Sequence, residues 1–132
     1  MSVYLKLIPE ADRHIGEDFV IKTFGIPEWF SDCTYRAHLK TLMADAQEYY
    51  ITDSRGYVQA YMAYNVSEDI HRQGNILDVH QFILNPNYVH SASEVKEIWK
   101  LVKVLAKLEQ CDFISHYKHV NSSIINHITR RV

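Results

Sequence analysis

The chain has 132 residues, of which 47% are hydrophobic and 23% are charged, and its formal net charge is −2. This length predicts a single domain over residues 1–132, and the composition excludes a disordered chain. The near-neutral charge and the lack of a basic stripe argue against binding to nucleic acid. The N-terminus reaches Lys6 too early for a signal peptide, and no apolar run approaches the ~18 residues of a membrane span. We therefore expect synthesis in the cytoplasm and no membrane contact.

The N-terminal part of the chain predicts one strand and two helices. Apolar and polar residues alternate over 3–8, which indicates a strand, and Pro9 follows it. Apolar residues then recur at helical spacing over 14–24, and Gly25 is a plausible stop. The same spacing predicts a second helix over 34–46.

The middle of the chain predicts a β-hairpin followed by a buried strand. A strand begins at Tyr49, the turn signal Asp53-Ser54-Arg55-Gly56 follows, and residues 57–66 form the returning strand. The polar stretch 67–74 predicts a loop. Residues 75–84 are apolar on both faces, which is typical of a strand covered on both sides.

The last third predicts a long helix, a strand and a short helix. Residues 91–94 have the pattern of a capping box, and an apolar stripe continues from there to about residue 110. A strand is predicted over 111–120, and Asn121 would then cap a final helix over 124–131. The expected fold is therefore α+β (α/β in the broad sense), with a mixed sheet of about five strands flanked by four helices.

This order of elements resembles the GNAT (Gcn5-related N-acetyltransferase) superfamily. In that family the central strand ends in an apolar-x-Pro-x-aromatic segment, which Ile83-Leu84-Asn85-Pro86-Asn87-Tyr88 matches. The segment Val120-Asn121-Ser122-Ser123-Ile124-Ile125 is similar to the capping asparagine at the start of the family's last helix. The resemblance covers nearly the whole chain, except that the last two family strands are lacking.

The resemblance implies acetyl-CoA as a cofactor, with its pyrophosphate at the N-terminus of the long helix. The candidate cofactor-binding residues are Ile83, Leu84, Tyr88, Ser91, Ala92, Ser93 and Asn121. Val89 and His90 depart from the family pattern, and Glu94 brings a carboxylate close to the expected phosphate. Glu94 equally serves as the capping-box partner of Ser91. Ile128 stands where the family often has a tyrosine acid, and it has no proton to donate.

Asp78 and His80 are the candidate catalytic residues. They are two apart on the central strand, so their side chains share a face. Such a pair could deprotonate an amine, or it could belong to a solvated or hydrogen-bonded face. Neither the histidines nor the two cysteines have the spacing of a metal site, so we expect no metal.

A sheet that ends at the fifth strand would have an open edge near residues 111–120. Open edges tend to be paired or covered, so we expect a protein partner or self-association there. Two functions fit these features. One is a non-catalytic interaction or structural module, similar to small GNAT-like bacteriophage virion proteins, which would reside in the host cytoplasm or the virion. The alternative is an acyl-CoA-dependent N-acyltransferase with an atypical pyrophosphate loop.

Overall fold

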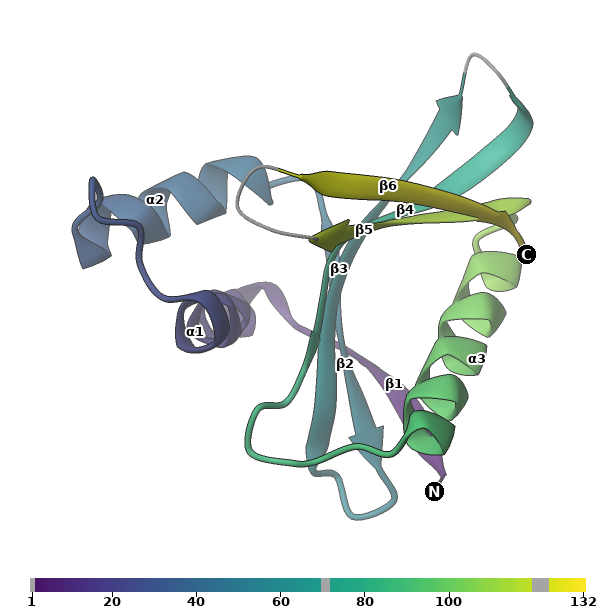
Figure 1. Cartoon of the computed structure of the whole chain (residues 1–132), viewed down its shortest axis with the longest axis horizontal. Coiled ribbons are helices and arrows are strands. Elements are labelled where there is room, and N and C mark those ends of the chain that lie inside the picture. The colour runs from purple at the N-terminus through teal and green to yellow at the C-terminus, as the bar shows by residue number, and fades with distance from the viewer. Residues whose placement is uncertain (1, 70–71, 120–123) are drawn as a thin grey trace.

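The computed structural model describes residues 2–69, 72–119 and 124–132, and it has the expected mixed α+β architecture. Six strands form one sheet in chain order, and only the β4–β5 pair is parallel. Helices α1 and α2 lie on one face of the sheet and α3 lies on the other (Figure 1). The elements are β1 (Val3–Leu7), the 3-10 turn η1 (Glu10–Asp12), α1 (Arg13–Phe24), α2 (Asp32–Leu42), β2 (Gln47–Asp53), β3 (Val58–Asp69), β4 (Arg72–Leu84), α3 (Ala92–Leu108), β5 (Phe113–His119) and β6 (Ile125–Arg131).

The α3 face of the sheet is held by an apolar core. Ile98, Val102 and Leu105 lie on one side of the helix and are buried against the strands. The predicted capping box is present, because the Glu94 amide donates to Ser91 Oγ at 3.2 Å and the Ser91 amide donates to Glu94 Oε1 at 3.4 Å. Periodicity and capping therefore both fix where α3 begins and which side it buries.

The opposite face has its own core, in which α1 approaches the sheet closely. Gly16 lies over the ring of Tyr61, where an added Cβ would come within 2.8 Å of ring atoms. Tyr61 is fully buried, and Phe19 stacks on it with ring centroids 5.9 Å apart. A side chain at position 16 would push α1 away from the sheet.

The main correction to the sequence analysis is that the predicted final helix is a strand. β6 pairs antiparallel with β5 over seven residues, from Phe113 opposite Arg131 to His119 opposite Ile125. The described residues therefore form three α-helices and six strands, rather than four helices and about five strands. The physical reason is backbone pairing, because β6 satisfies the amides and carbonyls that β5 would otherwise leave open. The edge expected near residues 111–120 is accordingly interior, and β1 and β6 are the edge strands.

The expected loop over 67–74 is also mostly strand. β3 continues to Asp69 and β4 begins at Arg72, so the two form a long hairpin that extends past the end of α3 (Figure 1). Asn121 lies outside the described residues. None of the helices in the described ranges is long and apolar enough to cross a bilayer.

Candidate functional site

The strands β4 and β5 diverge before the end of β4, where the candidate cofactor residues Ile83 and Leu84 lie. Their pairing ends at Val79 opposite His116, although β4 continues to Leu84. Ile83 is only 3% exposed and packs in the core beneath α1 and α2, so its side chain is not available to a ligand. Leu84 is half-buried on the α3 side.

The other cofactor candidates gather at the N-terminus of α3. Tyr88, Ser91, Ala92 and Ser93 are all exposed there. Glu94 and Tyr88 line a pocket of about 350 Å³. Because Ser91 and Glu94 bond to each other's backbone amides, two of the amides at this end of the helix are already satisfied by its own side chains.

The same pocket contains a second carboxylate. Asp53 pairs with Arg55 at 3.2 Å and accepts from the amides of Arg55 and Tyr57. Burial opposes the charge on Asp53, but these two amides and the Arg55 guanidinium hold the pKa of its carboxyl below the ordinary value. Arg55 offsets the charge of Asp53, and Glu94 leaves the pocket with a net negative charge where a pyrophosphate would bind. The residues present do not fit an anionic cofactor.

The catalytic candidates Asp78 and His80 do lie together. His80 Nδ1 is 3.9 Å from Asp78 Oδ2. The buried Ser115 donates from its hydroxyl to Asp78 Oδ1 at 2.8 Å. Ser115 was not among the residues predicted from the sequence, although it directly follows the apolar pair Phe113 and Ile114 on the expected strand.

The hydrogen bonds of His80 determine which of its nitrogens carries the proton. Asn65 Nδ2 donates to the carbonyl of Asp45 at 2.8 Å, which turns Asn65 Oδ1 toward His80 Nε2. An amide oxygen only accepts, so Nε2 must donate and has no lone pair with which to remove a proton. Asp78 is thus bonded to Ser115 and His80 to Asn65, and an ion-pair distance of 3.9 Å separates the two side chains.

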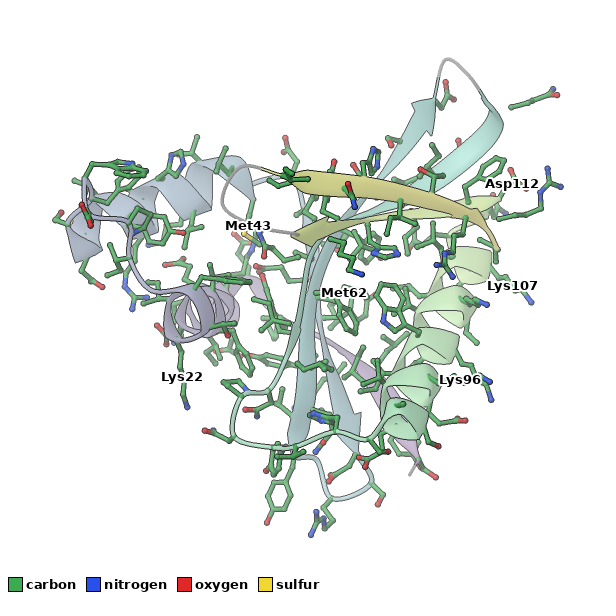
Figure 2. All side chains as sticks on the ribbon, in the orientation of Figure 1. Lys22, Met43, Met62, Lys96, Lys107 and Asp112 are labelled. Carbon is green, nitrogen blue, oxygen red and sulfur yellow. The ribbon has the colours of Figure 1, made fainter. Side chains whose placement is uncertain are left out.

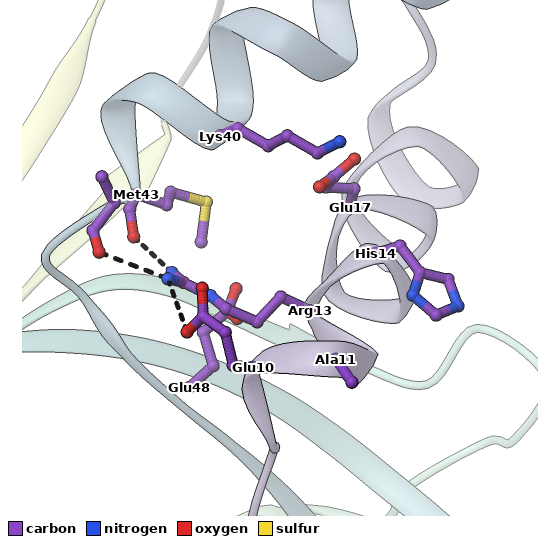
Figure 3. Close-up of a pocket in the computed structure, with 9 residues that line it drawn as sticks. Glu10, Ala11, Arg13, His14, Glu17, Lys40, Met43 and Glu48 are labelled. Carbon is purple, nitrogen blue, oxygen red and sulfur yellow. Dashed lines mark hydrogen bonds and ion pairs between the residues drawn. The ribbon is translucent and has the colours of Figure 1, made fainter.

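A second polar pocket, of about 410 Å³, lies between α1, α2 and β2 (Figure 3). Arg13 donates to Glu48 Oε2 at 2.7 Å and also to the carbonyls of Met43 and Ala44. The Tyr61 hydroxyl donates to Glu48 Oε1 at 2.5 Å. Burial, and then the bond to Glu48, raise the pKa of Tyr61 well above its ordinary value. This network ties the start of α1 to the end of α2 and to the sheet, which is a structural role.

Glu17 lines the same pocket and is 6% exposed. Its Oε1 has no hydrogen-bond donor among the described residues, and Arg36 is its ion-pair partner at 3.7 Å. Arg36 also forms ion pairs with Asp18 at 2.7 Å and with Asp32 at 3.2 Å. In the part of the chain that the structure describes, no group of three histidine, cysteine or acidic side chains could hold a metal ion.

The sequence matches no known protein-family profile. It is similar to Protein 7 of Escherichia phage T7, with 35% identity over 105 residues, which cover 76% of this chain and 78% of that protein.

Solved structures with the same fold include acetyltransferases. A GNAT family acetyltransferase of Staphylococcus aureus superposes with a TM-score of 0.61 and 12% identity over 96% of this chain and 94% of that one. The spermidine/spermine N-acetyltransferase SpeG of Vibrio cholerae superposes with a TM-score of 0.60 and 12% identity, over 89% of this chain and 70% of that one. A chain of a NatC complex bound to Gag peptide and CoA superposes with a TM-score of 0.53 and 14% identity, over 93% of this chain and 78% of that one. At these identities the likeness establishes the GNAT fold.

Proposed function

The chain belongs to the family of Protein 7 of Escherichia phage T7, and we propose that it is a phage protein in which the GNAT fold serves as a non-catalytic structural or interaction module. The observation that carries the proposal is the capping box at the N-terminus of α3, which occupies two of its backbone amides. Ser91 and Glu94 satisfy each other's backbone amides there, at 3.2 and 3.4 Å.

The electrostatics of this end support the same conclusion. A helix N-terminus attracts anions, but Glu94 already supplies the negative charge that the helix dipole favours. Glu94 and Asp53 line one pocket, and a carboxylate within 4–6 Å of a phosphate costs on the order of 1–3 kcal/mol at surface dielectric. The binding energy of a pyrophosphate would have to exceed this repulsion.

The proposal includes a surface that binds a partner protein, and this surface is the outer edge of β6. This strand presents an unpaired backbone edge, since β5 pairs with its other side. Ile125 is 56% exposed at the beginning of the strand. An exposed edge with an apolar side chain is suited to strand addition by a second protein or a second copy of the chain.

Calorimetry with acetyl-CoA tests the proposal directly. No heat of binding is expected at millimolar ligand, and micromolar affinity would overturn the proposal. Glu94→Gln removes the charge and retains a hydrogen-bonding side chain, so it is expected to strengthen binding of pyrophosphate. The matched control is Glu97→Gln, which changes the same charge one turn further along α3, where Glu97 pairs with Lys100. Equal effects of the two substitutions would contradict the repulsion argument.

The second candidate is an acyl-CoA-dependent N-acyltransferase, which the divergence of β4 and β5 beside Asp78 favours. In that case the base would be Asp78 or Nδ1 of His80, the nitrogen that keeps its lone pair while Nε2 donates. Acetyl-CoA turnover that is lost in Asp78→Asn, with binding retained, would establish this candidate in place of the first.

A further inference from the structure

A basic pocket lies between α3 and the strands β5 and β6. Its volume is about 380 Å³, and it is lined by Lys96, Trp99, Lys103, Ile114, His116, Arg130 and Arg131. Figure 2 labels Lys96 on α3. The lining contains four side chains that are cationic at neutral pH and no carboxylate, in a chain whose net charge is −2.

Three of the four cations in this pocket lack a close ion-pair partner among the described residues. Over the described residues, Lys96, Lys103 and Arg130 form no ion pair. The neighbouring Glu97 pairs instead with Lys100, at 3.0 Å. Arg131 lies over the ring of Phe113, 5.5 Å from its centroid. Unpaired cations gathered in one concave place favour an anionic ligand.

The helix and the strand bring these residues together from distant parts of the sequence. Lys96, Trp99 and Lys103 are at positions i, i+3 and i+7, which form one stripe along a helix. Arg130 reaches the same pocket from β6. The pocket therefore exists only because residues 125–131 form a strand beside β5.

Aromatic rings form part of the lining. Trp99 stacks on Phe82 with centroids 4.4 Å apart, and the ring of His116 is 5.0 Å from Trp99. Burial lowers the pKa of His116, and the charges of Arg130 and His127 lower it further. His116 is thus a neutral ring at pH 7, next to the cationic side chains of the pocket.

We propose that this pocket binds nucleotide phosphate, presented either by single-stranded nucleic acid or by a free nucleotide. Sites for single strands combine a basic groove with aromatic side chains, as this pocket does. An acidic peptide would use the cations but not the rings. The volume is within the range of small-molecule sites. The proposal differs from the sequence-based expectation of no nucleic-acid partner, and it concerns residues other than those at the N-terminus of α3.

Tryptophan fluorescence provides a direct test. Trp29 is 82% exposed, and Trp29→Phe leaves Trp99 as the only tryptophan. In this background, a ten-residue oligo-dT strand or dTMP is expected to quench the emission of Trp99 in 50 mM salt. Binding should weaken as salt rises, with a log–log slope of about −0.7 for each phosphate contact. Absence of quenching and of binding at 1 mM of either probe would overturn the proposal.

Charge variants locate the site. Lys103→Gln combined with Arg130→Gln should weaken binding at least tenfold and reduce the salt slope by about 1.4, which corresponds to two contacts. The control is Lys6→Gln, which removes one positive charge from the exposed edge strand β1, and it should leave binding unchanged. Equal loss in the control would contradict the assignment.

Two further comparisons distinguish a nucleic-acid strand from a free nucleotide, and either of these from an acidic protein. Oligo-dT that binds at least tenfold more tightly than dTMP identifies a strand as the source, and equal affinity identifies a free nucleotide. Displacement of oligo-dT by poly-glutamate at equal charge concentration would overturn the proposal in favour of an acidic protein. Neither nucleotide probe contains CoA. Acetyl-CoA binding that survives in the Lys103/Arg130 variant would contradict the proposed function and leave this inference intact.

Discussion

The two faces of the sheet are closed in different ways. One helix, α3, covers its face with fully buried apolar side chains such as Ile98 and Val102. On the other face, the ends of α1 and α2 are fixed by a buried polar network around Glu48. The comparison shows a long amphipathic helix that docks mainly through apolar area, and two shorter helices whose apolar core is supplemented by directed bonds.

The polar face should show the larger response to a single substitution. Glu48→Ala leaves Arg13 and the Tyr61 hydroxyl without their shared acceptor, so we expect the free energy of unfolding to fall by about 3–5 kcal/mol. Urea denaturation measures this change. The control is Glu10→Ala, since Glu10 pairs with the same arginine at 3.8 Å but its side chain is 90% exposed. That loss should be about 0–1 kcal/mol, and similar losses in both variants would contradict the account.

The apolar face is tested by Ile98→Ala. This side chain is 0% exposed, and its truncation should lower the free energy of unfolding by about 2–5 kcal/mol through lost burial and a cavity. Leu108→Ala, on the same helix but 73% exposed, should change it by about 0.5 kcal/mol or less. If Ile98→Ala is no worse than Leu108→Ala, α3 is not held by its apolar side.

The smallest expected effect is a pH dependence of folding stability that arises from His116, on the α3 face of the sheet. The pKa of His116 is lowered below 6.5 by burial first and then by Arg130 and His127. The unfolded chain therefore takes up a proton before the folded one does, and stability should fall as the pH drops from about 7 through 6.5. His116→Gln should reduce this dependence, as measured by unfolding at pH 7 and 5.5, whereas His14→Gln at an exposed site on the other face should not.

The NMR titration of His116 gives a sharper form of the same test. Arg130→Gln removes one of the charges that lower the pKa of His116, so this pKa should move toward 6.5. An unchanged pKa of His116 would show that Arg130 does not contribute to it.

Much of the fold was predictable because local patterns agreed with the tertiary structure. The Ser91–Glu94 capping box and the apolar stripe located α3, and period-two alternation located β1. The strand β6 was missed because Ile125 and Ile128 are three apart, a spacing that also suits a helix. Residues 125–131 form a strand because they pair with the backbone of β5. This is a tertiary interaction that the seven residues alone do not reveal.

The candidate site was predictable only where a motif was contiguous. The segment from Ile83 to Glu94 was correctly located at the end of β4 and the start of α3. The basic pocket could not be predicted, because Lys103 and Arg130 are far apart in sequence and meet only through β6. The bond from Ser115 to Asp78 likewise depends on the parallel register of β4 and β5.

Gly74, near the start of β4, carries a consequence for the history of the family. Its φ is 117°, and an added Cβ would come within 2.1 Å of Asp112 Oδ2, just before β5. Any other residue would face both an unfavourable backbone conformation and this contact. Across divergent relatives, glycine should therefore persist at this position while the surrounding hairpin residues drift.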